Sequence, residues 1–513
     1  MYKKPIKKIA AHILVASFCL ASVCTGISSD AKAKKPKLSK KTITITKGKT
    51  KTLKVSRTKK CKVTWKTSKK KVVSLSKKKR TSCKLKALKK GTSKITCKVK
   101  KNNKTYKLTC KVNVKAKKTV VATSLMGAYK NIVPYMGSCL NYGSSAAPGE
   151  LQKSSTMTFV KKHFNSFTLE NEMKPDSILG SSVTGLTVAK AKSMGYYIPA
   201  GYTEATVPQL NFTTIDKAME VAKNNGLKMR AHTLVWHSQT PAWFFTKNYD
   251  GSSVVSKETM DARLEFYVHN VMGHVMNKEK QLTGSAGSII YAWDVVNEYL
   301  HRPSFSFFKT WTSVYGDMGG SPSYVKRAFE IAYDMLKLYG AQDKVTLFYN
   351  DYNTYFGVQD TLNLVSFINK DEPAKICGGI GMQSHVDVKV PTVSQYGSAL
   401  EKFLAAGYEV QITELDFTIN FDTEGSSASY SYRDEGETDT DQAKFVKSLM
   451  QTIITKQKNR NKTINPKGIT SITLWGLCDA TSWRSQCAPL LFDTSVYDPK
   501  LSYYSFIEAA TIW

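Results

Sequence analysis

Two glutamates stand at the ends of strand-like stretches of the sequence, the first of them largely apolar. Residues 288–296 are almost entirely apolar and lead into Asn297 and Glu298, and residues 408–412 form a shorter stretch that leads to Glu414. A strand buried on both faces has such a nearly continuous apolar sequence, and catalytic groups gather at the carboxyl ends of parallel barrel strands. One Asn-Glu pair alone would also fit the start of an ordinary loop. Two carboxylates delivered by two strands, however, can act together as a proton donor and a nucleophile or base.

The segments around both glutamates resemble a known family. Residues 293–298 read WDVVNE and residues 412–416 read ITELD, and they are similar to the acid/base and nucleophile motifs of the xylanases of glycoside hydrolase family 10. The resemblance extends from Leu125 to the C-terminus. It implies a retaining endo-1,4-β-xylanase that cleaves internal bonds of xylan by double displacement, with Glu414 as the nucleophile and Glu298 as the acid/base.

This mechanism requires Glu298 to carry a proton while Glu414 stays ionised. Burial and the nearby negative charge of Glu414 are expected to raise the pKa of Glu298. The resemblance places His385 beside Glu414, where it would keep that carboxylate ionised, and Asp416 would orient His385. Asn297 is expected to hydrogen-bond the 2-hydroxyl of the sugar, a contact that strengthens in the transition state.

Other strand ends carry polar and aromatic side chains suited to sugar binding. Amides, carboxylates and ammonium groups hydrogen-bond to hydroxyls, although each would also fit a charged helix start, and a tryptophan is often a core residue. By resemblance, the expected substrate-binding residues are Glu170, Asn171, Lys174, His232, Trp236, Gln239, Asn297, Gln383, His385, Trp475 and Trp483. The polar residues 350–353 are expected to serve structural hydrogen bonding.

His232 and His237 raise the question of a metal site. Their odd spacing along a strand places them on opposite faces, and no third ligand follows them at a spacing typical of zinc sites. The sequence therefore implies neither a metal ion nor another cofactor.

Two other functions remain open from the sequence. The same barrel would suit an endo-β-1,4-glucanase, because contacts to the C5 substituent of the sugar decide between the two substrates. A polysaccharide-binding protein without catalysis is the other alternative. The presence of both glutamates, together with the residues expected to support them, argues against it.

These side chains need a scaffold of alternating strands and helices. Eight strand-like segments alternate with helical patterns after residue 125, which predicts a (β/α)8 barrel, an α/β fold. The predicted strands are residues 135–140, 165–169, 228–235, 289–296, 344–349, 379–383, 409–413 and 471–477, and the helices include residues 215–224, 324–338 and 442–456. Long loops are expected at residues 175–211, 244–258 and 421–441.

The strong positive charge lies in one part of the chain. The 513 residues carry a formal net charge of +37, but residues 34–118 hold 35 Lys or Arg and no Asp or Glu. Residues 119–513 are almost neutral, with 36 basic and 38 acidic residues. This uneven distribution argues against a nucleic-acid partner for the large domain and indicates a separate basic domain.

Residues 34–116 are predicted to form that domain. Apolar residues alternate with Lys or Thr, as in residues 42–46 and 94–99, which indicates about seven antiparallel strands around Trp65 and a small all-β sandwich. The pattern resembles the bacterial immunoglobulin-like domains of group two. Disorder is the alternative, because high charge and low hydrophobicity oppose folding. The lysines would either attract an anionic cell-wall polymer or only keep a spacer soluble.

Residues 1–33 have the features of an export signal. A basic head precedes the largely apolar residues 9–27, and residues 31–33 offer a small-residue cleavage site. We therefore expect a secreted protein whose mature form has no membrane span. We also expect it to be a monomer. A connector at residues 117–124 would join the basic domain to the barrel at residues 125–513.

Export would make disulfides possible. Four cysteines lie in the basic region and four in the large domain, and four cysteines allow three pairings. Cys478 and Cys487 flank a loop at the eighth predicted strand, so they are the best candidates for a bridge.

Overall fold

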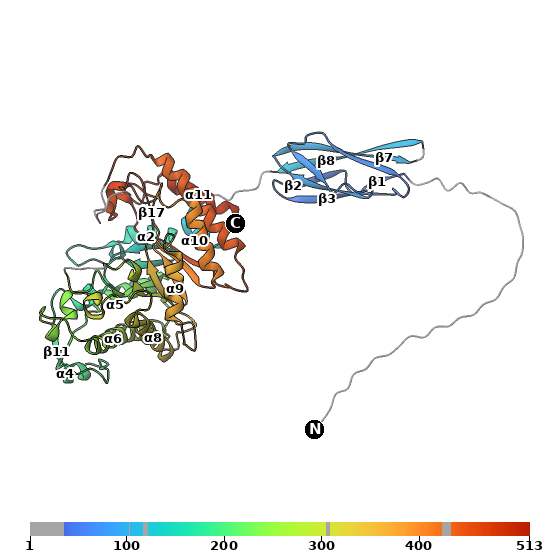
Figure 1. Ribbon diagram of the computed structural model, residues 1–513. Helices are drawn as coiled ribbons and strands as arrows, with labels where there is room; N and C mark the ends of the chain where they lie inside the picture. The colour runs from blue at the N-terminus through green and yellow to red at the C-terminus, as the bar shows by residue number, and fades with distance from the viewer. Residues whose placement is uncertain (1–34, 102, 116–121, 304–307, 423–431) are drawn as a thin grey trace, which may run out of the picture. The chain divides into compact units, whose positions relative to one another are not determined.

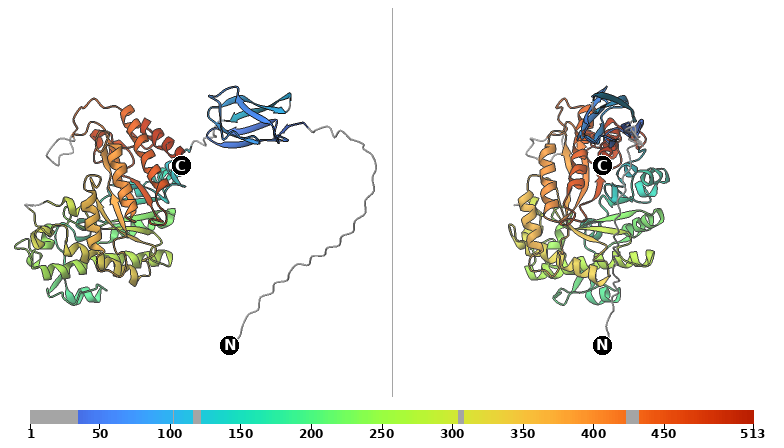
Figure 2. Two further views of the ribbon diagram at one scale, coloured as in Figure 1. Left: turned by 45° about the vertical axis from the view of Figure 1, so that its right-hand side comes forward. Right: turned by 90° about the vertical axis from the view of Figure 1, so that its right-hand side faces the viewer.

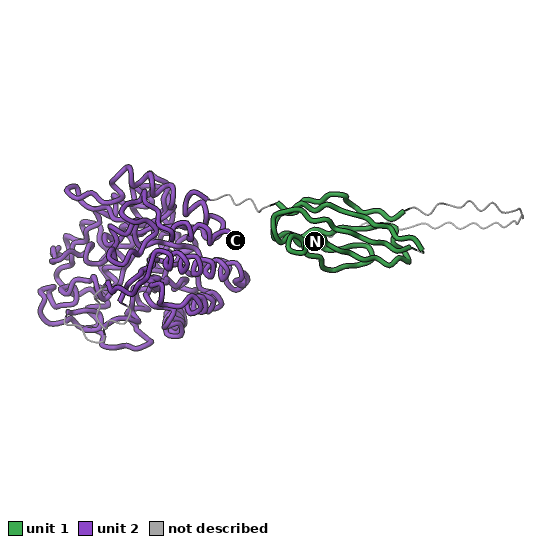
Figure 3. The backbone as a smooth tube through the Cα atoms, turned by 90° about the horizontal axis from the view of Figure 1, so that it is seen from above, with its two compact units in different colours: residues 1–119 green, residues 120–513 purple. Residues whose placement is uncertain are grey.

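The computed structural model describes residues 35–101, 103–115, 122–303, 308–422 and 432–513. The chain forms two compact units, residues 1–119 and residues 120–513 (Figure 3). The expected export signal and most of the expected connector lie outside the described residues. Those two predictions, and the domain limits that depend on them, stay predictions.

The larger unit is a closed parallel barrel, as the sequence predicts. Its strands follow the order β9, β10, β13, β14, β15, β16, β18 and β19, and β19 pairs again with β9; the short β17 pairs with β18. The strands are β9 (Tyr135–Leu140), β10 (Ser166–Leu169), β13 (Lys228–Trp236), β14 (Ile290–Asn297), β15 (Thr346–Asp351), β16 (Gly379–Met382), β17 (His385–Asp387), β18 (Glu409–Thr418) and β19 (Ile469–Leu474). Each predicted strand overlaps one of these.

Helices lie against the outside of the barrel (Figures 1 and 2). The longer ones are α2 (Ser154–His163), α5 (Thr213–Asn225), α6 (Lys257–Thr283), α8 (Ser323–Leu338), α9 (Val358–Ile368), α10 (Val393–Ala405), α11 (Asp439–Asn459) and α12 (Leu501–Ala509). Their ends follow local chemistry: the Thr392 side chain caps the start of α10, and α5 ends at Gly226 in the left-handed conformation. Among the described residues, none of the helices is both long enough and apolar enough to cross a membrane.

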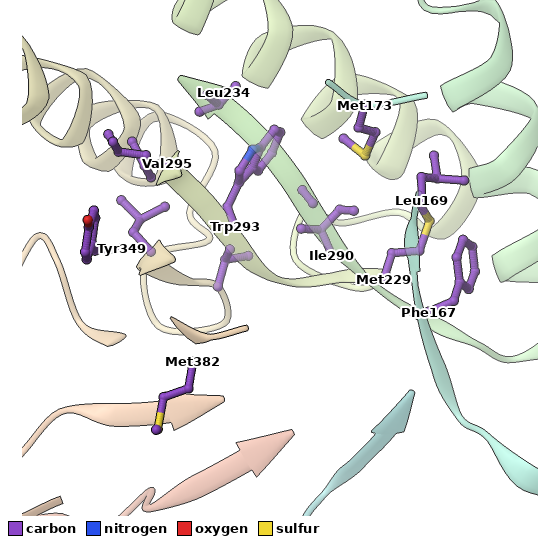
Figure 4. Packing of buried hydrophobic residues seen from close by; sticks show 14 of the residues in the cluster. Phe167, Leu169, Met173, Met229, Leu234, Ile290, Trp293, Val295, Tyr349 and Met382 are labelled. Carbon is purple, nitrogen blue, oxygen red and sulfur yellow. The ribbon is translucent and has the colours of Figure 1, made fainter. Parts of the chain in front are cut away.

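Most buried apolar side chains of the larger unit, from strands and helices alike, belong to one cluster. Figure 4 shows side chains from neighbouring strands in this core, among them Met229, Ile290, Trp293 and Tyr349, all of them buried. Full burial of a large apolar side chain stabilises a fold by about 1.5–3 kcal/mol. This core fixes the strands whose ends carry the candidate site.

A buried polar network joins strands β13, β14 and β18. The Arg230 guanidinium donates two hydrogen bonds to Asp294, at 2.6 and 3.0 Å, and a third to Gln411 Oε1 at 2.5 Å. Arg230 and Asp294 are both fully buried. A buried charge is tolerated when it is paired and hydrogen-bonded in this way.

The loop predicted at residues 175–211 contains structure of its own. It forms α3 (Pro175–Leu179), β11 (Gly185–Thr187), α4 (Val188–Ser193) and β12 (Thr206–Pro208). Short helices also occur elsewhere, as α1 (Leu125–Tyr129) and α7 (Trp311–Tyr315). Much of the loop predicted at residues 421–441 lies outside the described residues.

The smaller unit is a sandwich of two four-stranded sheets, in the orders β1-β3-β6-β5 and β2-β8-β7-β4. Its strands are β1 (Lys37–Leu38), β2 (Thr42–Thr46), β3 (Thr50–Ser56), β4 (Lys62–Thr67), β5 (Val73–Ser76), β6 (Ser82–Ala87), β7 (Gly91–Lys101) and β8 (Lys104–Lys115). All pairs are antiparallel except β2 with β8, which is parallel. Leu53, Trp65 and Val99 are buried in a core that this unit keeps to itself. The unit is therefore folded, and its immunoglobulin-like kinship stays a prediction.

The predicted bridge between Cys478 and Cys487 is wrong. All eight cysteines of the described residues are buried free thiols. The Cys478 sulfur lies 3.5 Å from the Thr481 hydroxyl, and the Cys487 sulfur lies 3.8 Å from the carbonyl oxygen of Asn420. Two cysteines that flank one loop need not meet, because a bridge also requires close and correctly directed Cβ atoms.

Candidate active site

Glu298 follows β14 directly and turns the chain out of the barrel wall. Its φ of 59° lies in the left-handed region, and its N–H donates to the carbonyl of Asn350 at the end of β15, at 2.9 Å. A non-glycine residue in this conformation costs about 1–3 kcal/mol and persists where its surroundings hold it, typically at functional sites. The Glu298 carboxyl accepts hydrogen bonds from Trp236 Nε1 and Gln383 Nε2, each at 2.7 Å.

Glu414 lies within β18 and is buried. Its N–H donates to the carbonyl of Gln383, just after β16, at 2.9 Å. Its carboxylate accepts a hydrogen bond from Asn350 Nδ2 at 2.8 Å and faces His385 Nε2 at 3.2 Å. Asn350 at the end of β15 and His385 in β17 thus hold the Glu414 side chain, while Gln383 holds its backbone.

Three side-chain amides connect the two glutamates. Gln383 Nε2, which contacts Glu298, lies 3.3 Å from Asn297 Oδ1, and Asn350 Nδ2 donates to the same oxygen at 2.9 Å. Because Asn350 also donates to Glu414, an unbroken chain of hydrogen bonds runs from one carboxyl to the other. The structure therefore brings both predicted catalytic residues, with Asn297 and Gln383, into one site.

The environment of Glu298 favours its protonated form. Burial raises the pKa of Glu298 to about 7, and the negative charge of Asp351 adds to the effect of burial. Glu414 raises it less than Asp351 does, while the hydrogen bonds from Gln383 and Trp236 act in the opposite direction. The expected cause, burial together with Glu414, is therefore incomplete.

Asp351 belongs to a buried polar cluster behind Glu298. Its carboxylate accepts hydrogen bonds from His301 Nδ1 at 2.7 Å, from the Tyr349 hydroxyl and from the N–H of Tyr352 at 2.8 Å. Burial raises the pKa of Asp351 as well, against the effect of His301. Residues 350–353 were expected to serve structural hydrogen bonding, and Asn350, which hydrogen-bonds Glu414, was not among the predicted site residues.

The environment of Glu414 favours the ionised form. Burial alone would raise the pKa of Glu414, but the hydrogen bond from His385 and the charges of His232 and His385 outweigh burial and lower the pKa to about 2. Burial would lower the pKa of His385, yet Asp416, 2.7 Å from its Nδ1, raises it to about 9. An imidazolium beside the Glu414 carboxylate favours the ionised form of that carboxylate.

Lys174 hydrogen-bonds polar residues that follow β10 and β13. Its ammonium donates to Asn171 Oδ1 at 3.0 Å and to Gln239 Oε1 at 2.8 Å. It also lies 5.1 Å from the centre of the Trp236 ring, within cation–π range. Trp236 contacts Glu298, so this group adjoins the Glu298 side of the site.

Glu170 lies near this group at the end of β10. Its carboxylate accepts a hydrogen bond from Asn141 Nδ2 at 3.2 Å. Burial raises the pKa of Glu170, and the hydrogen bond from Asn141 and the charge of Lys174 counter that rise.

An aromatic group adjoins Glu414 on the other side. The Trp475 ring meets His232 and His385 edge-on, with centroids 5.9 and 6.2 Å apart. Trp483 lies 4.8 Å from the His385 ring, and its Nε1 donates to Asp416 at 3.1 Å. Trp475 is buried, whereas Trp483 is 38% exposed. The predicted binding residues thus flank the two glutamates, and their individual roles stay predictions.

Comparison with known proteins identifies the family. The sequence profile of glycosyl hydrolase family 10 matches residues 125–509. The chain belongs to this family. It is therefore a glycoside hydrolase, and the family 10 unit coincides with the barrel.

The family 10 relatives include enzymes of several bacteria. The chain is 42% identical over 390 residues to endo-1,4-beta-xylanase A of Butyrivibrio fibrisolvens, which covers 76% of this chain and 85% of the relative. It is 34% identical over 357 residues to endo-1,4-beta-xylanase A of Thermotoga neapolitana, covering 68% of this chain and 28% of the relative. The second relative is thus far longer than the part that matches.

Solved structures show the same fold. The CBM22-1 and GH10 modules of a Clostridium thermocellum endo-1,4-beta-D-xylanase, complexed with xylohexaose, match with a TM-score of 0.57 and 26% identity, covering 85% of this chain and 72% of that one. An endo-1,4-beta-xylanase from Caldicellulosiruptor owensensis matches with a TM-score of 0.54 and 28% identity, covering 75% of this chain and 99% of that one. A GH10 xylanase from termite gut containing a bacterial Ig-like domain covers 92% of this chain and 98% of its own, at a TM-score of 0.55 and 22% identity, a likeness of fold alone.

Proposed function

We propose that the protein is a secreted, retaining endo-1,4-β-xylanase. The observation that carries this proposal is the opposite shift of two connected carboxyls, with the pKa of Glu298 raised to about 7 and that of Glu414 lowered to about 2. A neutral acid beside an ionised carboxylate is the pair that glycoside hydrolysis requires. The names of the relatives support xylan as the substrate.

The two carboxyls divide the reaction into two steps. The ionised Glu414 attacks the anomeric carbon while Glu298 gives its proton to the departing oxygen, so that one C–O bond forms as the glycosidic C–O bond breaks. Glu298, now ionised, then takes a proton from water, whose oxygen displaces Glu414 from the same carbon. Two inversions leave the anomeric configuration unchanged.

Asn297 fits the role of positioning the sugar. Its side-chain oxygen already accepts hydrogen bonds from Gln383 and Asn350, which directs its Nδ2 group to act as a donor. A donor next to both carboxyls suits the 2-hydroxyl of the sugar in the cleaved position, where the contact strengthens in the transition state.

Analysis of products tests the reaction and the substrate together. We expect the full chain to release short β-1,4-linked xylose oligomers from soluble xylan, with β-anomers detected first by proton NMR. Initial α-anomers would overturn the retaining mechanism. Faster release from a β-1,4-glucan than from xylan would favour the glucanase, and no release from either polymer would favour a binding protein.

Substitution of the two glutamates tests the assigned roles. Glu414→Ala and Glu298→Ala should each reduce kcat on xylan by roughly four orders of magnitude, because each removes a group that forms or breaks a bond. On an aryl xyloside whose leaving group needs no proton, Glu298→Ala should lose much less activity than on xylan. Glu414→Ala should lose as much activity on this substrate as on xylan. Circular dichroism serves as the control for folding, and equal losses of Glu298→Ala on both substrates would contradict the assignment.

Export is supported by the basic head and apolar stretch of residues 1–33. We expect the protein to be recovered from the culture medium or the cell wall with its N-terminus just after residue 33. Mass spectrometry of the natural protein decides this point, and an intact residue 1 on protein retained in the cytoplasm would contradict it.

A further inference from the structure

One outer face of the basic unit carries a regular array of lysines. Strands β4, β7 and β8 alternate buried apolar residues with exposed Lys or Thr, so the exposed set lines a single face of the sheet β2-β8-β7-β4. We call this set the lysine face; it consists of Lys62, Lys66, Lys94, Lys98, Lys100, Lys107 and Lys111, with Thr64, Thr96 and Thr109 between them. Figure 1 shows β7 and β8 as the long strands of this unit.

The register of the sheet sets lysines directly opposite one another. Lys62 pairs with Lys100, Lys98 with Lys107, and Lys94 with Lys111. Directly opposite residues on neighbouring strands lie only about 4.5–5.5 Å apart at Cβ, and like charges in such pairs destabilise a sheet. Because residues 34–118 contain no Asp or Glu, no side-chain carboxylate within that stretch relieves the repulsion.

The other sheet of the sandwich is also rich in lysine, but its lysines are paired differently. On its outer face Lys37 is opposite Ser56, Lys54 is opposite Ser82, and Lys84 and Lys86 are opposite Ser or Thr on both sides. Within the described strand pairs of that sheet, no lysine stands opposite another lysine. Lys101 also stands opposite Lys104, at the adjoining ends of β7 and β8 and off the lysine face. The three opposed pairs of the lysine face nevertheless do not follow from the abundance of lysine alone.

We propose that the lysine face is a docking surface for a phosphodiester-linked polymer of a bacterial cell wall, in which each repeat carries a negative charge. A polyanion laid across the face would relieve the repulsion of every opposed pair at once, and the intervening threonine hydroxyls would donate hydrogen bonds to phosphate oxygens. This proposal rests on the export part of the proposed function, because the wall is outside the cytoplasm.

The choice of lysine over arginine supports a densely charged partner rather than one with isolated acid groups. Of the 35 basic residues in residues 34–118, only Arg57 and Arg80 are arginines. Arginine recognises single carboxylates with two parallel hydrogen bonds, whereas lysine acts as a point charge. A polysaccharide with scattered carboxylates would meet one lysine at a time and leave the opposed pairs unrelieved. Docking would hold the family 10 unit at the cell surface.

Sedimentation of the full chain with purified Gram-positive walls tests the proposal. We expect binding at low salt that weakens steeply as salt rises, since it depends on exchange of counterions. Walls treated with cold hydrofluoric acid, which cleaves phosphodiester bonds, should bind at least about tenfold less protein, in keeping with the loss of the charged polymer.

Two variants with the same change of charge locate the surface. Lys94→Gln, Lys98→Gln, Lys107→Gln and Lys111→Gln together should weaken wall binding about tenfold or more, because the array is what meets the polyanion. The matched control carries Lys37→Gln, Lys54→Gln, Lys84→Gln and Lys86→Gln on the other sheet and should weaken binding much less. The first variant should also unfold at a higher temperature in low salt, because it removes two opposed pairs.

Three results would overturn the proposal. They are equal weakening by both variants, undiminished binding to phosphate-stripped walls, and release from walls by soluble glucuronoxylan more readily than by polyphosphate. Activity on soluble neutral xylan, measured on the same samples, distinguishes failure of the docking proposal from failure of the xylanase proposal. Protein that is active on xylan but does not bind walls would contradict only the proposed docking surface. Protein that binds walls but has no activity on xylan would contradict only the proposed xylanase function.

Discussion

At the scale of single residues, the proton on Glu298 depends on a group that is not its catalytic partner. Burial raises the pKa of Glu298 most, and the charge of Asp351 raises it more than that of Glu414 does. Two tasks are thereby separated. His385 favours the ionised form of Glu414, whereas burial together with the Asp351 carboxylate favours the protonated form of Glu298, as the proposed mechanism requires.

The raised pKa of Glu298 predicts how kcat/KM depends on pH. Glu298 must be protonated at the start of the reaction, so kcat/KM should fall as the pH rises through about 7. Asp351→Asn removes a negative charge and lowers the pKa of Glu298, so the alkaline limb should move to lower pH while activity near pH 5 changes less. A pH profile of kcat/KM on soluble xylan, whose departing oxygen needs the proton, measures the shift, and Asp334→Asn on the exposed side of α8 is the control. An unmoved alkaline limb would show that Asp351 has no such role.

At the scale of elements, the barrel depends on a charged pair inside its wall. Arg230 on β13 and Asp294 on β14 are fully buried, and Asp294 also lies 2.9 Å from Nδ1 of His232. The pair therefore links the packing of two strands to the histidine beside Trp475. Loss of one partner would leave the other as an uncompensated buried charge.

We expect Asp294→Ala to destabilise the barrel by about 3–5 kcal/mol. The control is Asp334→Ala, which removes the partner of Lys337 in an ion pair whose side chains are 64% and 51% exposed, and it should change stability by less than about 1 kcal/mol. Urea unfolding followed by tryptophan fluorescence measures both, because seven of the eight tryptophans belong to residues 120–513. Equal stability of the two variants would mean that the buried pair does not support the barrel.

At the scale of the whole molecule, the two units have separate cores. The apolar cluster of the sandwich and that of the barrel share no residue. Each unit thus buries its own apolar surface, as independently folding domains do.

We expect residues 120–513, produced alone, to hydrolyse soluble xylan with kcat within about twofold of the full chain, because every group of the candidate site and its core lies in this unit. Initial rates on soluble xylan measure this, and thermal unfolding of the shortened chain provides the control for folding. A large loss of kcat in a folded, shortened chain would show that the basic unit takes part in catalysis.

The strand ends were the most informative part of the sequence. A buried strand that stops at Asn297 and Glu298 is visible in a local run of residues, and each predicted barrel strand overlaps an observed one. The disulfide prediction failed because the approach of Cys478 and Cys487 depends on the path of a loop. Asn350 was passed over because its partners, Asn297 and Glu414, come from other strands.

The sequence by itself determined the alternation of strands and helices, the confinement of positive charge to residues 34–118, and the two carboxylates at strand ends, because each of these is a local pattern. Only the tertiary structure decided the closure of the barrel, the opposed lysines of one sheet and the opposite pKa shifts of Glu298 and Glu414. These depend on which groups distant in the chain come within a few ångströms of one another, and electrostatic interactions are strong only at such distances.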